Sequence, residues 1–203
     1  MDQSVSPTTF LFIRHAQTVW NKEQRHAGST EVPLSDQAGH QIAKLTRKIG
    51  KAEVKITALY SSPLSRCRFT IAPLSRELHL PVTISDNLKE RGLGDWEGRS
   101  PVDLAPLHPG YHFPDSAYTG EFRIPHAEPL EELEQRIRAF LNEVHDQHPG
   151  EQVAICTHSG VIWTIHHRIA TNPPDRFIWP GNCSITTIVS EQNHFKLTAY
   201  EEI

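Results

Sequence analysis

Thr9-Phe10-Leu11-Phe12-Ile13-Arg14-His15 is the stretch of sequence that decides the fold. A short run of bulky, uncharged residues is typical of a strand buried inside a sheet. The run stops at Arg14-His15, and the carboxyl ends of parallel strands are where α/β proteins bind ligands. Val153-Ala154-Ile155-Cys156 ends in the same way, at Thr157-His158. Two strand-end histidines with arginines nearby indicate an anionic substrate, and phosphate chemistry in particular.

Strand patterns alternate with helix patterns along the rest of the chain. We expect strands at 9–14, 56–61, 82–85 and 153–157, and helices at 35–49, 65–78, 129–148 and 159–169. A hairpin follows, with strands at 183–190 and 194–200 joined by Glu191-Gln192-Asn193. This order predicts an α/β fold of three layers, α/β/α. Its mixed sheet has about six strands, mostly parallel with one antiparallel, and helices on both faces.

Local signals refine this outline. Ser35 is the predicted N-cap of the first long helix. Pro73 falls inside the helix at 65–78, where it removes a backbone donor. Residues 87–126 have no sustained periodicity, and a segment of that length is usually functional or partly helical. We expect residues 1–203 to form a single domain with a small cap inserted at about 99–128.

Composition narrows the class of partner. The chain has 203 residues and a formal net charge of −4, so no global basic field favours nucleic acid or an anionic membrane. The N-terminal segment has no basic region, and its apolar run is too short for a signal peptide or a membrane span. Cys67, Cys156 and Cys183 match no Cys-x-x-Cys pattern. We therefore expect a cytoplasmic protein without nucleic-acid or membrane partners. An oligomer stays open.

Arginines are the expected phosphate ligands. Phosphoryl transfer needs positioning and cations that stabilise charge on the equatorial oxygens. The planar guanidinium binds phosphate oxygens in pairs and stays charged. Arg14 ends the first strand, and Arg66 follows the turn Ser61-Ser62-Pro63-Leu64, near a helix N-terminus that itself attracts anions. For Arg68, a salt bridge and a phosphate contact remain equal alternatives.

An imidazole can attack phosphorus and form a phosphohistidine. The attacking nitrogen must be unprotonated while the other ring nitrogen is held by an acceptor. His15 suits this role, and His158 suits proton sharing or charge stabilisation beside it. The leaving alkoxide needs a proton, and Glu90, after the third strand, is the best-placed acid.

Other polar and aromatic residues are assigned structural roles. The chain holds 13 histidines, yet no predicted helix carries His-x-x-x-His and no Cys pair is present, so we expect no metal. His26 could reach the mouth of the site, but a surface position is the favoured expectation. We expect Trp96 in packing and Glu97 in an ion pair. The remaining residues expected to serve structure are His166, His167, Asn182 and Ser184.

Five motifs together resemble the histidine phosphatase superfamily, also called phosphoglycerate mutase-like. They occur in the order of that family and cover about 9–190. The motifs are Leu11-Phe12-Ile13-Arg14-His15-Ala16-Gln17-Thr18 with Asn21, Ser61-Ser62-Pro63-Leu64-Ser65-Arg66-Cys67-Arg68-Phe69-Thr70, Leu88-Lys89-Glu90-Arg91-Gly92-Leu93-Gly94-Asp95-Trp96-Glu97-Gly98, Thr157-His158-Ser159-Gly160 and Asn182-Cys183-Ser184-Ile185-Thr186.

The resemblance implies a role for each site residue. His15 is the phosphorylated nucleophile, and Glu90 protonates the leaving group and then activates water. Arg14, Arg66 and His158 form the phosphate pocket with His15. Asn21, Gln17 and Thr18, from the first motif, are also expected to bind the phosphate. The family needs no metal, and no cofactor is expected.

Two positions depart from the family pattern. Ala16 stands where glycine is usual, a change of one methyl group. Ala127-Glu128-Pro129 stands where Gly-Glu-Ser is usual, so a serine contact is lost.

The resemblance favours a phosphomonoesterase that hydrolyses a small phosphorylated metabolite. The alternative within the family is phosphoglycerate mutase-type transfer, which typically uses a longer, more basic excursion than residues 100–126. The Gly-Asp-Trp-Glu-Gly pattern also resembles the phosphatase branch. The alternative from another class is a catalytically silent phosphate-binding regulatory module.

Overall fold

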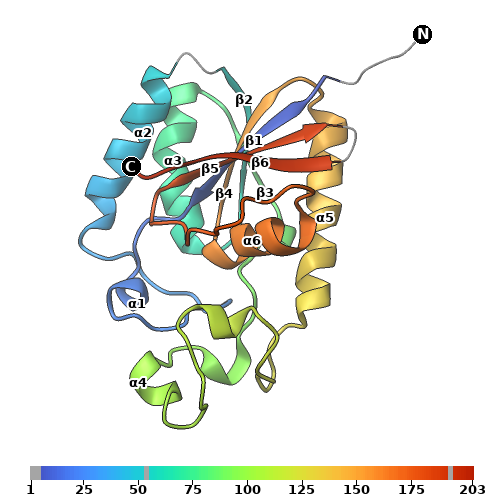
Figure 1. Ribbon diagram of the computed structural model, residues 1–203. Helices are drawn as coiled ribbons and strands as arrows, with labels where there is room; N and C mark the ends of the chain where they lie inside the picture. Colours follow the sequence, from blue (N-terminus) through green and yellow to red (C-terminus); the bar gives the residue numbers. More distant parts are fainter. Residues whose placement is uncertain (1–5, 53–54, 192–193) are drawn as a thin grey trace.

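The computed structural model describes residues 6–52, 55–191 and 194–203 (Figure 1). Within these residues, six strands form one sheet in the order β3-β2-β4-β1-β5-β6. The strands are β1 (Thr8–Arg14), β2 (Ile56–Ser61), β3 (Val82–Ile84), β4 (Gln152–Thr157), β5 (Ile185–Glu191) and β6 (His194–Glu201). The first four are mutually parallel, whereas β5 runs antiparallel to both β1 and β6. The predicted mixed sheet is therefore confirmed.

The register of the central strands positions the site. β1 lies between β4 and β5, and Arg14 of β1 is paired with Thr157 of β4. The next residues, His15 and His158, consequently leave the sheet at the same edge. The backbone N–H of His15 donates to the carbonyl of Thr157 at 3.0 Å, which extends the pairing by one residue.

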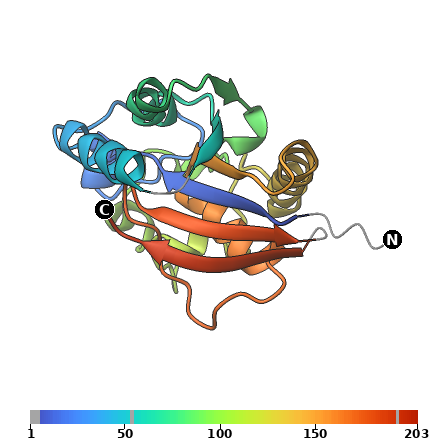
Figure 2. The same ribbon diagram turned by 90° about the horizontal axis from the view of Figure 1, so that it is seen from above.

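Helices cover both faces of the sheet (Figure 2). α2 (Ala38–Lys51) and α3 (Ser65–Leu78) pack on one face, and α5 (Leu130–Gln147) and α6 (Ser159–Thr164) pack on the other. Side chains alternate along a strand, so β1 contributes to both cores. Phe10 and Phe12 face α5 and α6, whereas Ile13 faces α2 and α3.

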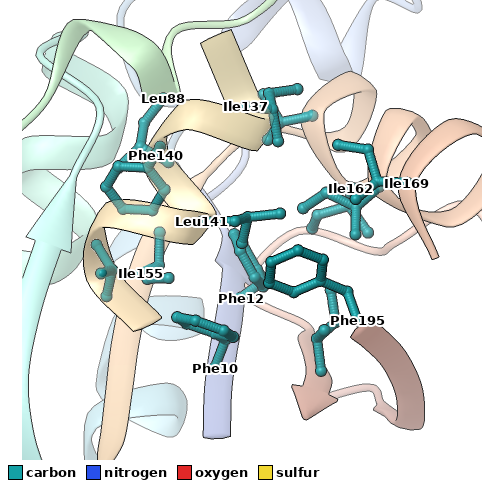
Figure 3. Close-up of a cluster of buried hydrophobic side chains, with 14 of the residues drawn as sticks. Phe10, Phe12, Leu88, Ile137, Phe140, Leu141, Ile155, Ile162, Ile169 and Phe195 are labelled. Carbon is teal, nitrogen blue, oxygen red and sulfur yellow. The ribbon is translucent and has the colours of Figure 1, made fainter. Parts of the chain in front are cut away.

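The core beside α5 is rich in aromatic side chains (Figure 3). Phe10, Phe12 and Phe140 are fully buried or nearly so, together with Leu141 and Phe195. Burying one such side chain contributes about 1.5–3 kcal/mol. This core fixes β1 and β4, and therefore the residues that follow them.

Several boundaries differ from the prediction. α2 begins at Ala38, and Ser35 does not cap it, because the Ser35 hydroxyl donates to Gln17 Oε1 at 2.9 Å. α3 runs unbroken through Pro73. The helix after β4 changes at Ile165 into a π-helix, η4 (Ile165–Ile169). The predicted hairpin tip includes residues 192–193, which lie outside the described residues.

The excursion between β3 and α5 lies beyond the carboxyl end of β1 (Figure 1). It is partly helical, as expected: η1 (Asp86–Leu88), η2 (Gly94–Trp96), α4 (Pro101–Leu104) and η3 (Asp115–Ala117) are short turns. Trp96 centres an apolar cluster with Tyr111, Tyr118 and Trp163 of α6. The excursion therefore has its own small core, which docks on α6; we call this segment the cap. Along the described part of the chain, no helix combines the length and apolarity needed to cross a bilayer.

Candidate active site

A cavity of about 240 Å³ lies between the carboxyl ends of the parallel strands and the cap. Arg14, His15, Arg66 and Glu90 all line it. They come from three parts of the chain: Arg14 ends β1 and His15 follows it, Arg66 lies in the first turn of α3, and Glu90 lies in the loop after η1. The topology thus brings together side chains that are up to 76 positions apart in the sequence, and His158 lies directly behind them.

His15 presents one free ring nitrogen. Its Nδ1 lies 2.8 Å from the carbonyl oxygen of Ala16, which can only accept, so Nδ1 carries the proton. The lone pair therefore resides on Nε2. Burial and the nearby charges of Arg66 and Arg14 hold the pKa of His15 well below its ordinary 6.5. The imidazole is neutral at physiological pH, as a nucleophile must be.

Arg66 is a fully buried cation held by neutral partners. Its Nη1 donates to the Thr30 carbonyl at 2.8 Å and its Nη2 to the Gly28 carbonyl at 2.7 Å. Its Nε donates to Nδ1 of His158 at 3.3 Å. Because these partners carry no formal charge, the guanidinium is fixed in place without being neutralised by them. The arrangement attracts an anion.

His158 supports the site from behind. It is fully buried, and its ring centroid lies 5.2 Å from that of His15. Nδ1 accepts from Arg66, so Nε2 donates to the Ser62 hydroxyl at 2.9 Å. Burial and the charge of Arg66 hold the pKa of His158 well below 6.5. The ring therefore orients Arg66 as a neutral hydrogen-bond acceptor, and it does not line the cavity.

Arg14 directly precedes His15 in the chain, and its Nη1 donates to the carbonyl of Pro180. Its Nε is buried and has no hydrogen-bond partner among the described residues. Burial lowers the pKa of Arg14 from its ordinary value, yet a guanidinium remains protonated in proteins. Arg14 thus brings a second cation to the cavity.

Glu90 is a buried carboxyl group. Its Oε2 accepts from the backbone N–H of Gly160 and its Oε1 from that of Arg91, both at 3.0 Å. The Tyr118 hydroxyl also hydrogen-bonds to it. Burial raises the pKa of Glu90, although these amides and Arg66 oppose the shift. A carboxyl with a raised pKa holds a proton that it can donate.

Glu97 organises the loop that holds Arg66. Its two oxygens accept from the backbone N–H groups of Ser29, Thr30 and Leu93, each at 2.9 Å. These hydrogen bonds take the place of the ion pair that we expected. Gly28, at φ 51°, lies so close that an added Cβ would be 2.1 Å from Glu97 Oε1. The carbonyls of this loop are the ones that accept from Arg66.

Only some of the site residues expected from the first motif lie at the cavity. Asn21 lines the cavity, and its Oδ1 accepts from the side chain of Asn182 at 3.1 Å, which also donates to the His15 carbonyl. The structure does not bring Gln17 and Thr18 to the cavity. Gln17 Oε1 accepts from Ser35, and Thr18 forms the capping box of α1 (Val19–Lys22) with Asn21.

The structure accommodates both departures from the family pattern. Ala16 is fully buried in the core beneath α2 and α3, and its carbonyl still accepts from His15. Glu128 pairs with Arg136 through both oxygens, at 2.7 and 3.0 Å. Arg136 also donates to the carbonyl of Glu90, at 3.3 Å, and so helps to hold the acid.

Some residues lie where the sequence did not place them. His26 is buried and lines the cavity, whereas we expected it at the surface. Arg25 and Trp179 line the cavity as well, although nothing in their local patterns marks them. Arg68 is exposed on α3, away from the cavity. Across the described segments, no cluster of three or more His, Cys, Asp or Glu side chains is arranged as a metal site.

Comparison with known proteins places the chain in a family. Residues 10–203 match the family model of the histidine phosphatase superfamily (branch 1). An uncharacterized phosphatase, PhoE, of Bacillus subtilis is 31% identical over 168 residues, covering 83% of this chain and 80% of the relative. Phosphoglycerate mutase-like protein 4 of Arabidopsis thaliana is 30% identical over 168 residues, covering 82% and 73%.

A solved structure has the same fold. A mycobacterial glucosyl-3-phosphoglycerate phosphatase superposes with a TM-score of 0.82 at 21% identity, covering 97% of this chain and all of that chain (100%). With a family model that spans nearly the whole sequence, and with Arg14, His15, Arg66 and Glu90 lining one cavity, the chain belongs to the histidine phosphatase superfamily, branch 1.

Proposed function

We propose that the protein is a metal-independent phosphomonoesterase that hydrolyses a small phosphorylated molecule through a phosphohistidine at His15. The observation that carries the proposal is the environment of this imidazole. Its Nδ1 is fixed on the Ala16 carbonyl, its pKa is low, and it lines a cavity together with two arginines and a carboxylic acid. Phosphatase-named relatives support the same activity class.

In the first half-reaction, Nε2 of His15 attacks phosphorus and forms the N–P bond while the P–O bond to the alcohol breaks. Glu90 gives its proton to the departing alkoxide, so that the product leaves as a neutral alcohol. Arg14 and Arg66 stabilise the charge that spreads over the equatorial oxygens. Both cations line the cavity before the reaction begins, so they need little reorganisation.

In the second half-reaction, the Glu90 carboxylate takes a proton from water. The water oxygen attacks phosphorus, the N–P bond breaks, and its electrons return to Nε2. Inorganic phosphate forms, His15 is again neutral, and Glu90 is again protonated. The buried position of Glu90, between two backbone amides, suits a group that alternates between these two states.

Phosphoglycerate mutase-type transfer is the competing assignment, since several relatives carry mutase or mutase-like names. A mutase must keep its phosphoryl group from water, whereas a phosphatase releases it. Incubation with a phosphoglycerate distinguishes them: we expect inorganic phosphate to accumulate. Transfer between phosphoglycerates with little release of phosphate would instead establish the mutase.

The intermediate itself can be trapped. Quenching into base during turnover of ³²P-labelled substrate should leave label on the protein that acid removes, and His15→Ala should carry none. Label at the wild-type level in folded His15→Ala would contradict the assignment of the nucleophile. A folded protein that turns over no phosphate ester between about pH 5 and 8 would point to a silent binding module.

We further propose a cytoplasmic location. The three cysteines, Cys67, Cys156 and Cys183, are free and buried, which suits a reducing compartment.

A further inference from the structure

Beyond the phosphate-binding groups, four ring side chains line the cavity. His26, Phe113, Tyr118 and Trp179 all line it. They come from separate parts of the chain: the loop after α1, the cap, and the segment before β5. Because the rings come from three separate segments and line the same small cavity, the fold as a whole determines this part of the cavity wall.

The rings support one another in pairs. The centroids of His26 and Phe113 lie 4.8 Å apart, and those of Tyr118 and Trp179 lie 5.5 Å apart. Trp179 is also fixed by its Nε1, which donates to Asp115 Oδ1 at 3.0 Å. Phe113 retains 36% exposure, so it stands at the mouth with one side open. Centroid separations of about 4.5–7 Å are typical of favourable ring contacts.

This wall carries little charge toward a substrate. Burial lowers the pKa of His26 to about 4, so its ring is neutral at pH 7, and its Nε2 lies 2.7 Å from the Tyr111 hydroxyl. Arg25 also lines the cavity, but its Nε donates to Glu23 at 2.7 Å and its Nη1 to the Gly98 carbonyl at 2.8 Å. Arg25 thus has a carboxylate partner, whereas the hydrogen-bond partners of Arg14 and Arg66, where the phosphate binds, are uncharged.

The volume limits the size of the alcohol. Pockets for drug-sized ligands are roughly 300–1,000 Å³, and this cavity measures about 240 Å³. A phosphate with one ring suits that space better than a long chain or a nucleotide.

We propose that the site takes phosphate monoesters whose alcohol carries one uncharged ring, and that Phe113 and Trp179 select for that ring. This assignment of substrate class rests on the phosphatase activity proposed above. Stacking against the two rings stabilises the bound alcohol, while Arg25, a cation that also lines the cavity, is already paired with the carboxylate of Glu23.

The test compares three substrates: benzyl phosphate, ethyl phosphate and 3-phosphoglycerate. All three have alkyl leaving groups, so their intrinsic reactivities are similar and differences report on binding. For the wild-type protein, we expect kcat/KM for benzyl phosphate to exceed the other two by about tenfold or more, because two ring contacts each contribute about 0.5–1.5 kcal/mol.

Substitutions of Phe113 distinguish the contribution of its aromatic ring from the contribution of a large apolar side chain. Phe113→Ala and Phe113→Leu should each lower kcat/KM for benzyl phosphate about three- to tenfold and leave that for ethyl phosphate within about twofold. Trp179→Leu should likewise lower kcat/KM for benzyl phosphate and leave that for ethyl phosphate nearly unchanged. Phe69→Ala, at a ring that is 62% exposed on α3 outside the cavity, is the matched control and should change neither.

Each result bears on a separate claim. Equal kcat/KM values for the three substrates, a preference for 3-phosphoglycerate, or an equal loss on both alkyl substrates in Phe113→Leu would overturn the proposed ring selectivity while leaving the phosphatase intact. Turnover of none of the three by the folded protein would instead refute the phosphatase activity.

Discussion

The backbone N–H of Gly160 donates to Oε2 of Glu90 at 3.0 Å, so the first turn of α6 holds the proposed acid at the cavity. This contact depends on the absence of a side chain at Gly160. A Cβ there would lie 2.4 Å from Glu90 Oε1 and 2.3 Å from Tyr118 Cε1. Both groups are buried, so neither can move aside freely.

Gly160→Ala should therefore displace Glu90 and lower kcat for benzyl phosphate by about 100-fold or more, the usual contribution of a positioned acid. Steady-state kinetics on the folded variant measures it. Gly39→Ala, where the added methyl meets no atom within 4 Å, is the matched control and should keep wild-type activity. Unchanged kcat in Gly160→Ala would mean that this amide does not position the acid.

Glu90→Gln should separate the two half-reactions. With p-nitrophenyl phosphate, the phenolate leaves without a proton, so the phosphoenzyme forms but water is not activated. We expect a burst of about one nitrophenolate per protein, followed by turnover about 10²–10⁴ times slower than wild type. Glu121→Gln, at an exposed carboxylate in the cap, should show neither effect. A steady-state rate near the wild-type value would remove Glu90 from the mechanism.

The stability of the protein should depend on the proton that Glu90 holds. Its pKa is raised in the folded state, mainly by burial. Above the unfolded value of about 4.3, the folded state therefore binds more protons than the unfolded state. Stability from this group then falls as pH rises through the folded pKa.

The melting temperature of the wild type, relative to Glu90→Gln, should thus decrease between about pH 5 and 8. The expected change is about 2–4 °C for each kcal/mol involved. Thermal unfolding of both proteins across this range measures it. A difference between them that stays constant, or grows in favour of the wild type, would show that Glu90 does not carry a raised pKa.

Glu97 should act on the reaction through Arg66. Glu97→Gln removes the charge that organises the amides of Ser29 and Thr30, whose loop holds the guanidinium. Hydrogen bonds to charged groups contribute about 1.5–3 kcal/mol. We expect kcat/KM and the affinity for inorganic phosphate to fall about 10- to 100-fold.

The double variant decides whether this effect passes through Arg66. In an Arg66→Ala background, Glu97→Gln should cause little further loss, because the coupled residues give non-additive changes. Glu121→Gln again serves as the control. Fully additive losses would mean that Glu97 only supports the fold.

The sequence predicts those parts of the molecule that depend on local pattern. Strand β2 and helix α3 have the predicted bounds, because an uncharged run and an amphipathic repeat each carry their own signal. Arg14, His15, Arg66 and Glu90 follow regular elements, and they meet because the carboxyl ends of parallel strands share one edge. For these residues, the position in the sequence together with the predicted sheet is enough to predict that they lie close together.

The rest depends on contacts between distant segments. Ser35 has the chemistry of an N-cap, but Gln17, 18 positions earlier, takes its hydroxyl. His26 reads as a surface residue until the cap folds over it and supplies Tyr111 and Phe113 as neighbours. Trp179 reaches the cavity from an irregular segment. Neither the partner of Ser35 nor the position of Trp179 could be assigned from the residues around them.

The burial of Arg66 has a consequence for the folded state as a whole. Removing a guanidinium from water disfavours folding, and the carbonyls of Gly28 and Thr30 with the ring of His158 offset only part of that. An anion in the cavity supplies the opposite charge and binds only the folded chain. If the proposed reaction takes place here, the folding equilibrium is therefore tied to the phosphate concentration around the protein, and the product of the reaction acts as a stabiliser.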